Sequence, residues 1–141
     1  MHKKALLAFE AVLYIACRGG AEAVSLKDIC RAAGVTERYL EQDMQRLVRS
    51  GILKGFRGPK GGYLLARERR KISLHDICRS VAAKEEKGGS VLAKEVIKPF
   101  AEKLDEAVET ELVKLSIEDL YEKAKEKGID RILKHNSDFN I

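Results

Sequence analysis

Four polar side chains between residues 38 and 49 are spaced so that they would share one face of a helix. Arg38, Gln42, Gln45 and Arg49 recur at intervals of three and four residues. Guanidinium and amide groups arranged in such a row can form hydrogen bonds with base edges in the major groove of DNA. Most helix surfaces are only solvated, so the functional interpretation depends on what surrounds this face.

The basic residues of the chain are concentrated in the same region. The 141 residues include 27 Lys and Arg against 22 Asp and Glu, a net charge of +5. Residues 31–71 hold 11 basic and 4 acidic residues and carry +7, whereas residues 72–141 hold 12 and 15 and carry −3. A local positive excess is typical of a face that binds a polyanion, although a merely solvated basic surface would have the same composition.

Metal, redox and catalytic chemistry have little support in the sequence. The cysteines, Cys17, Cys30 and Cys78, are far apart and form no Cys-x-x-Cys pair, so they predict neither a disulfide framework nor a zinc finger. We expect them to be buried and inert, because redox sensing requires an exposed thiolate. The three histidines are scattered, and no nucleophile or phosphate-binding motif indicates an enzyme. We therefore expect no catalytic activity, no metal and no cofactor.

Two helices that meet at a short turn must position the polar face. A capping pattern, Ser25-x-x-Asp28, begins a short helix that ends at Gly34. Thr36 is a fresh N-cap for a longer helix that ends at Gly51. The buried face of this longer helix would comprise Leu40, Met44, Leu47 and Val48. This arrangement is typical of a helix-turn-helix.

A β-hairpin is predicted directly after the second of these helices. Residues 52–57 and 63–67 have strand character and flank a loop, residues 58–62, that contains three glycines and one proline. A hairpin with a basic tip beside a helix-turn-helix is a wing. We expect its glycines to let the backbone approach a phosphate chain, while Arg57 and Lys60 supply positive charge.

Further helices would complete a domain over residues 1–82. The first helix ends at Gly19 and would face inward through a stripe of apolar residues: Leu6, Phe9, Leu13 and Ala16. A second capping pattern, Ser73-x-x-Asp76, begins another helix that runs to about Val81. The fold class predicted for this domain is mainly α with a small β-hairpin, a winged helix-turn-helix.

A long amphipathic helix is expected beyond a charged connector over residues 83–90. Its apolar stripe recurs at intervals of three and four residues: Ile97, Phe100, Leu104, Val108, Leu112 and Leu115. Because the preceding domain can close its own core, we expect this stripe to pair with a second copy of the chain; folding back onto its own domain is an alternative, and we expect a mixture of both. Residues 91–127 would contain this dimerisation helix and one further helix, and residues 128–141 a loosely ordered tail.

Three runs of sequence form a recognisable pattern. They are residues 24–29, residues 34–42 and, most specifically, residues 57–67 in the order Arg-Gly-Pro-Lys-Gly-Gly-Tyr-x-Leu-Ala-Arg. The pattern resembles the Rrf2 family of bacterial winged helix-turn-helix transcriptional regulators. The resemblance covers residues 1–82 strongly and extends more weakly to residue 120. It implies a homodimer that binds a pseudo-palindromic operator in double-stranded DNA, with the second helix in the major groove and the wing in the minor groove.

The resemblance also implies which residues contact DNA. Arg38, Tyr39, Glu41 and Gln42 match positions that contact bases and phosphates, and Arg57 matches the arginine of the wing. Tyr39 has an equal alternative as a packing residue. With the polar face and the wing included, the predicted DNA-binding residues are Ser25, Thr36, Glu37, Arg38, Tyr39, Glu41, Gln42, Gln45, Arg46, Arg49, Arg57, Lys60, Gly61, Gly62 and Tyr63.

The chain departs from the family at one important place. Many members have three cysteines in the loop before the long helix, where they bind an iron–sulfur cluster that sets DNA affinity. Residues 83–98 contain no cysteine, and no other residue type there can replace three thiolates. The resemblance therefore points to a cluster-free member. We expect a repressor, because occluding the polymerase requires only tight binding; the effector is not indicated.

Two alternatives remain at this point. One is a redox or metal sensor with atypical ligands, in which Cys78 and carboxylates such as Glu85 combine across the dimer. The other is a protein-interaction module that keeps the fold without DNA affinity. In either case we expect a cytoplasmic protein without a membrane partner, because no apolar run approaches the roughly 18 to 20 residues that span a bilayer and the basic N-terminus leads into no signal core.

Overall fold

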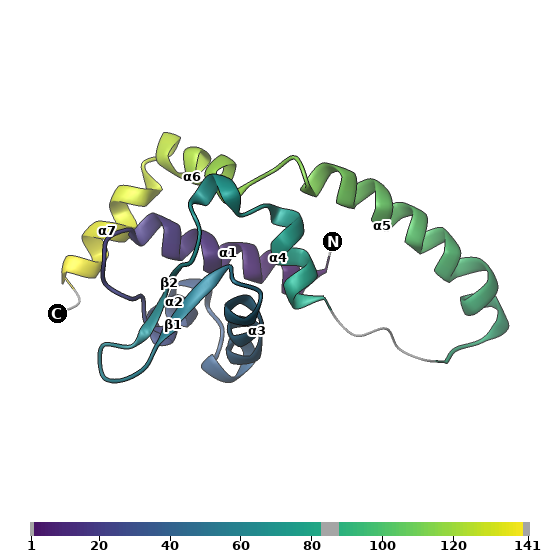
Figure 1. Ribbon diagram of the computed structural model, residues 1–141, viewed down its shortest axis with the longest axis horizontal. Coiled ribbons are helices and arrows are strands. Elements are labelled where there is room, and N and C mark those ends of the chain that lie inside the picture. The colour runs from purple at the N-terminus through teal and green to yellow at the C-terminus, as the bar shows by residue number, and fades with distance from the viewer. Residues whose placement is uncertain (1, 83–87, 140–141) are drawn as a thin grey trace.

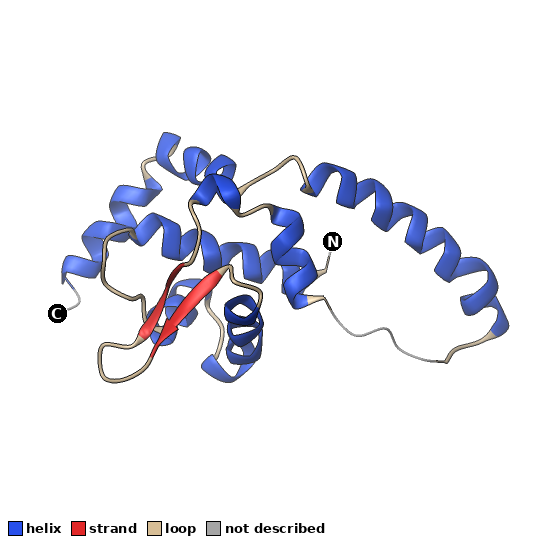
Figure 2. Cartoon of the chain, in the orientation of Figure 1, coloured by secondary structure: helices blue, strands red, loops and turns tan. Residues whose placement is uncertain are grey.

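The computed structural model describes residues 2–82 and 88–139, and of residues 135–139 only the backbone. The described chain is mainly helical with one two-stranded antiparallel hairpin, which confirms the predicted fold class (Figures 1 and 2). The elements in chain order are α1 (Lys3–Arg18), α2 (Leu26–Ala33), α3 (Glu37–Arg49), β1 (Leu53–Phe56), β2 (Gly62–Leu65), the 3₁₀ turn η1 (Arg69–Lys71), α4 (Leu74–Val81), the π-helical segment η2 (Ala93–Ile97), α5 (Lys98–Leu112), α6 (Ile117–Glu126) and α7 (Ile129–Phe139).

Hydroxyl side chains fix the starts of three helices, as predicted. Ser25, Thr36 and Ser73 each accept a hydrogen bond from the N–H group three residues further on, at 3.0–3.2 Å. Each bond satisfies a donor that the first turn of a helix leaves without a partner. Gly34 ends α2 in the left-handed conformation with a φ of 71°, so α2 and α3 meet at a short turn and form the helix-turn-helix.

The carboxylates expected to complete the first two capping boxes bind arginines instead. Asp28 lies 3.5 Å from Arg18, and Asp76 lies 3.1 Å from Arg67. Among the described helices, the reciprocal arrangement is present at Ser116, the N-cap of α6. The other two carboxylates therefore join neighbouring elements rather than close the cap beside them.

The hairpin pairs as the sequence predicts. β1 and β2 are antiparallel, with Leu53 opposite Leu65 and Phe56 opposite Gly62. Strand β2 is tied to the loop before α2 by two backbone bonds. The N–H of Val24 donates to the carbonyl of Tyr63 at 2.9 Å, and the N–H of Tyr63 donates to the carbonyl of Val24 at 2.8 Å. This pairing fixes the wing against the helix-turn-helix.

α1 lies at the centre of the domain and is covered on several sides. It contacts α2, α4, α6, α7 and β2. Half of its sixteen residues are buried: Ala5, Ala8, Phe9, Ala11, Val12, Ile15, Ala16 and Cys17. The predicted stripe was wrong at Leu6, which is 52% exposed. The other three residues of the stripe are covered, since Phe9 and Ala16 are buried and Leu13 is half-buried.

The last two helices complete the domain. α6 packs on α1 and η1, and α7 packs on α1 and α6. The N–H of Ile117 donates to the carbonyl of Ile72 at 2.9 Å, and the N–H of Leu74 donates to the carbonyl of Leu115 at 2.9 Å. Where the sequence predicted a loosely ordered tail, residues 129–139 form α7, and its Leu133 packs against the core.

α5 extends away from this domain (Figure 1). Its apolar side chains are largely exposed: Val96 and Ile97 in η2 just before it, and Phe100, Leu104 and Val108 within it. The predicted stripe is wrong at its end, since Leu112 is only 6% exposed and belongs to the core of its own chain, while Leu115 lies beyond the end of α5. No helix within residues 2–82 and 88–139 combines the length and the apolar character needed to cross a bilayer.

Candidate nucleic-acid interface

The buried face of α3 holds its polar face in solvent. Leu40, Met44 and Leu47 are completely buried, so the opposite side of the helix points outward. Seven of the predicted contact residues are exposed on α3: Glu37, Arg38, Tyr39, Glu41, Gln42, Gln45 and Arg49. Their exposure leaves these side chains free to contact a ligand.

An open groove separates α3 from the wing. Gln45 and Arg49 line one side, and Phe56 and Arg57 line the other. Half-buried Tyr63 also lines the groove. The structure therefore brings together polar residues from two predicted elements that are separated in sequence.

The basic residues of region 31–71 fall into two groups. Five have a carboxylate within 4 Å: Arg31, Arg46, Arg67, Arg69 and Arg70. The other six have no carboxylate partner among the described residues: Arg38, Arg49, Lys54, Arg57, Lys60 and Lys71. Five of these six belong to α3 or to the hairpin. The unpaired positive charge of this region thus lies mainly on α3 and the hairpin, and Arg49 and Arg57 line the groove itself.

Arg46 has a partner within the chain. Its guanidinium donates to the carboxylate of Asp43 at 2.6 Å, and Asp43 is only 2% exposed. A buried carboxylate is costly unless it is paired, so this bond stabilises α3 from within. We accordingly leave Arg46 out of the candidate interface.

Three other predicted residues also have roles in the fold. The hydroxyls of Ser25 and Thr36 accept the capping bonds described above. Tyr63 is held by its backbone bonds to the loop before α2, and burial raises the pKa of its phenol, with further increases from the nearby Glu41 carboxylate and Cys30. The Tyr63 hydroxyl therefore stays protonated and can act as a donor at the wall of the groove.

The glycines of the wing serve different purposes. A Cβ atom on Gly61 would lie 2.5 Å from the carbonyl oxygen of Phe56, and one on Gly62 would overlap the carbonyl of Val24. The hairpin itself therefore requires these two glycines, whereas the sequence interpretation assigned them to phosphate contact. Gly58 has a φ of 100° and open space around it, so it is the loop glycine that leaves room for an approaching backbone.

The sequence interpretation missed two residues of the wing. Phe56 lines the groove and is 48% exposed, and Lys54 is exposed on the same strand. Positions 54 and 56 share one face of a strand because side chains alternate between faces. That alternation was the signal available in the sequence.

The three cysteines lie partly or wholly within the fold. Cys17 and Cys30 are buried and Cys78 is half-buried. Burial raises the pKa of all three thiols, so the thiolate form is disfavoured. Within the described part of the chain, no group of three or more His, Cys, Asp or Glu side chains is arranged to hold a metal ion. Glu85, the carboxylate suggested as an atypical ligand, lies outside the described residues.

Comparison with known proteins places this geometry in a family. The model of the Rrf2 family, described as iron-dependent transcriptional regulators, matches residues 1–123. The chain belongs to the Rrf2 family. This finding confirms the resemblance, and it agrees with the winged helix-turn-helix seen in the structure and with the expectation that the protein is not an enzyme.

Relatives of this Rrf2 chain include named transcriptional regulators. The HTH-type transcriptional regulator IscR of Escherichia coli (strain K12 / DH10B) is 36% identical over 78 residues, which cover 55% of this chain and 48% of the relative. The chain thus spans about half the length of the curated relatives it matches.

Solved structures extend the likeness over most of the chain. IscR of T. potens has a TM-score of 0.71 at 33% identity, covering 90% of this chain and 89% of that one. CymR of B. subtilis, described as the global cysteine regulator, has a TM-score of 0.67 at 28% identity, covering 87% and 96%. The likeness therefore includes parts of the chain outside the helix-turn-helix and the wing.

Proposed function

We propose that this Rrf2 member is a transcriptional regulator that binds a pseudo-palindromic operator in double-stranded DNA as a homodimer. The observation that carries the proposal is the groove between α3 and the wing, with unpaired cations on both sides. Cations that already bind carboxylates inside the chain contribute little to binding a polyanion, whereas unpaired ones can displace the counterions of DNA. Relatives that are named as transcriptional regulators support the same function.

In this proposal, α3 reads bases and the wing contacts the DNA backbone. Arg38, Gln42, Gln45 and Arg49 carry the fork-shaped and amide groups that recognise base edges in a major groove. Arg57 and Lys60 at the wing supply charge toward phosphates. Tyr39, Glu37 and Glu41 are exposed on α3 beside its base-reading residues and contact the DNA around them.

The homodimer forms through the exposed face of α5. Apolar side chains of η2 and α5 lie in solvent within the single chain, and exposed apolar patches of this kind mark interaction surfaces. A second copy would cover them, because two-fold pairing places the same helix from each chain side by side. The dimer would then present two α3 helices to the two halves of an operator.

The protein acts in the cytoplasm as a repressor and without an iron–sulfur cluster at the family's usual place. The description of the family names iron, but clusters are held by several thiolates, and residues 83–98 contain no cysteine. The donors described above do not fit such a cluster. Anaerobic reconstitution with iron and sulfide tests this part, and a protein that acquires the visible absorption of a cluster contradicts it.

Selection of bound genomic fragments tests the central proposal. The full chain is expected to enrich a small set of fragments that share a pseudo-palindrome, and binding to them should weaken steeply with added salt, with a log–log slope of about −0.9 for each phosphate neutralised. Failure to enrich any fragment at low salt would contradict DNA binding. That result would favour a protein-interaction module.

A further inference from the structure

We propose that Arg67 is a positioning residue that holds the C-terminal end of α3 in the orientation needed to read DNA. This inference rests on the proposed function. Arg67 follows the wing and belongs to none of the predicted contact sets. Its Nε donates to the carbonyl of Gly51 at 3.1 Å, its Nη2 to the carbonyl of Ser50 at 3.1 Å, and its Nη1 to the carboxylate of Asp76 at 3.1 Å. We call these three bonds the Arg67 network.

The end of α3 is a place where such bonds matter. The last carbonyls of a helix have no partner within it. Here the chain turns sharply after Ser50, because Gly51 has a φ of 75° and Ile52 is already completely buried. Arg67 binds the carbonyls of Ser50, the C-cap of α3, and of Gly51, just beyond the helix, and its charge complements the negative end of the helix dipole. The Arg67 network therefore fixes both the last turn of α3 and the turn that leads into the wing.

The network also ties α3 to α4. Asp76 lies in the first turn of α4, so it holds the guanidinium from the side away from α3. A second link joins the same helices, since the hydroxyls of Ser50 and Ser80 lie 2.8 Å apart. The end of α3, the segment after the wing and the start of α4 are thus joined through one planar side chain.

This end of α3 contains part of the candidate interface. Arg49 is the last residue of α3 and directly precedes Ser50, and Gln45 lies one turn earlier. A small rotation of the last turn would displace both side chains relative to the Arg57 side of the groove. Specific recognition depends on this geometry, whereas non-specific binding depends mainly on charge.

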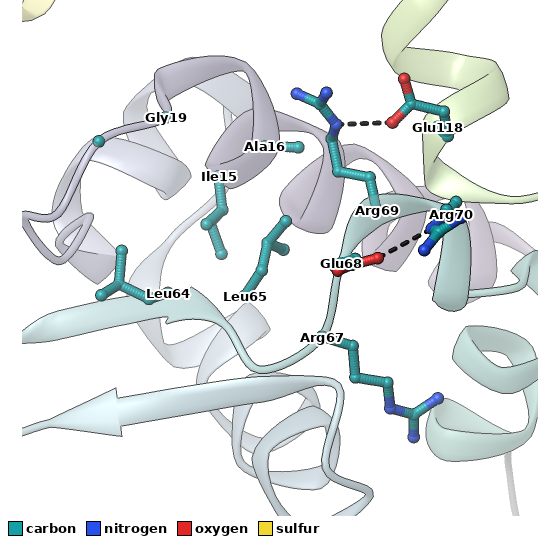
Figure 3. A pocket seen from close by; sticks show the side chains of 11 residues that line it. Ile15, Ala16, Gly19, Leu64, Leu65, Arg67, Glu68, Arg69, Arg70 and Glu118 are labelled. Atoms are coloured by element: carbon teal, nitrogen blue, oxygen red, sulfur yellow. Dashed lines mark hydrogen bonds and ion pairs between the residues drawn. The ribbon is translucent and has the colours of Figure 1, made fainter.

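The neighbouring arginines, Arg69 and Arg70, bind other partners and do not contact the end of α3. Figure 3 shows Arg67 and Arg69 projecting in different directions from the segment after β2. Arg69 donates to Glu118 on α6 at 2.7 Å, and Arg70 donates to Glu68 at 2.8 Å. Arg70 is exposed and binds Glu68 rather than α3, so it offers a matched control for the loss of one positive charge nearby.

The chemistry of the network calls for arginine. One guanidinium presents several N–H donors in a fixed plane, and the three acceptors of the Arg67 network, together with the carbonyl of Lys71 at 3.5 Å, use this geometry. A lysine at the same position would keep the charge but could not reproduce the planar set. An Arg67→Lys variant therefore separates charge from position.

The experiment compares wild type, Arg67→Gln, Arg67→Lys and Arg70→Gln as full chains. For each, we would measure affinity for an operator fragment taken from the selection above, affinity for a random duplex, the salt dependence of both, thermal unfolding, and amide hydrogen exchange of residues 49–52. We expect Arg67→Gln to lose about tenfold in operator affinity, since hydrogen bonds to charged groups contribute on this scale. Its affinity for the random duplex and its salt slope should match those of Arg70→Gln.

The same network predicts the remaining readouts. Arg67→Lys should resemble Arg67→Gln in operator affinity, and both should exchange the amides of residues 49–52 faster than wild type, whereas Arg70→Gln should not. Operator affinity in Arg67→Gln equal to that in Arg70→Gln would overturn the proposal. So would rescue by Arg67→Lys, because it would assign the effect to charge. An equal loss on operator and random DNA together with a lowered unfolding temperature would overturn it as well, by assigning Arg67 to general stability.

Failure of the proposed function gives a different pattern. If wild type binds no duplex, the DNA measurements contradict the function, and the exchange measurement still tests whether Arg67 holds the end of α3. Unchanged exchange at residues 49–52 in Arg67→Gln would then overturn the inference by itself.

Discussion

α1 and α5 are helices of 16 and 15 residues with similar apolar periodicity, yet they lie in very different surroundings. Half of the residues of α1 are buried against five other elements, whereas Leu112 is the one residue of α5 that is buried within the chain. The comparison is sharpest at two phenylalanines, since Phe9 is 7% exposed and Phe100 is 64% exposed. Apolar periodicity thus predicts that a helix has a face to cover, and tertiary structure decides whether the same chain covers it.

Phe9→Ala should have the largest effect on the fold. Removing a buried phenylalanine costs about 3–5 kcal/mol of unfolding free energy, because it removes apolar contacts and leaves a cavity. Urea denaturation followed by circular dichroism at fixed protein concentration measures this loss. A loss below about 1 kcal/mol would contradict the central position of α1.

Phe100→Ala makes the same chemical change on α5 and should act on pairing instead. We expect the dissociation constant of the homodimer to rise roughly 100- to 10,000-fold, since about 1.5–3 kcal/mol of burial is lost for each of the two Phe100 side chains. Sedimentation equilibrium measures the dimer, and Glu102→Ala on the same helix is the control. An unchanged dimer in Phe100→Ala would show that this face has another purpose.

Arg57→Ala should affect DNA binding and leave both the fold and the dimer intact. Arg57 has no carboxylate partner among the described residues, so its removal disturbs no ion pair inside the chain. The salt slope of binding to a selected fragment should fall in magnitude by about one phosphate contact. Arg70→Ala, which removes a cation already paired with Glu68, should change this slope less. Equal slopes in wild type and Arg57→Ala would show that the Arg57 side chain of the wing contacts no phosphate.

The three thiols should react at different rates because their side chains are buried to different degrees. Burial raises the pKa of Cys17, Cys30 and Cys78, so at pH 8 each thiol holds less thiolate than an ordinary cysteine, and alkylation should accelerate only at higher pH. Cys78 is half-buried beside α5 and should react before the two buried thiols. Mass spectrometry after iodoacetamide treatment at several pH values would show the order. A fast reaction of Cys17 on α1 would contradict it.

Leu6→Ser should have the smallest effect. Leu6 has the spacing of a buried residue but is exposed on α1, so its replacement should change the unfolding free energy by less than about 0.5 kcal/mol. The same denaturation experiment as for Phe9→Ala measures it. A loss of 2 kcal/mol would mean that the predicted stripe of α1, and not the observed one, is buried.

Local features of the fold could be read from the sequence because their causes are local. The hydroxyl caps at Ser25, Thr36 and Ser73 act on backbone groups three residues away. The wing follows from a glycine-rich loop between two short strands. These interactions depend on neighbouring residues alone, so their spacing is sufficient to predict them.

The remaining features depend on residues that are distant in sequence. Nothing near Arg67 indicates that it reaches Ser50 and Gly51, and charge alone did not separate Arg46, which holds Asp43, from the unpaired Arg49. α7 was missed for the same reason. Its docking partner is α1, more than a hundred residues earlier in the chain.

Backbone bonds join residues 72–74 to residues 115–117, so the domain is closed at this point whatever the length of α5. The chain leaves after the last residue of α4 and returns beside its first, so both ends of the excursion are attached to the same helix. Adding or removing full helical turns in it, at about 5.4 Å each, would alter how far α5 extends from the domain without repacking the rest. The length of α5 and the surface formed by α3 and the wing can therefore vary independently.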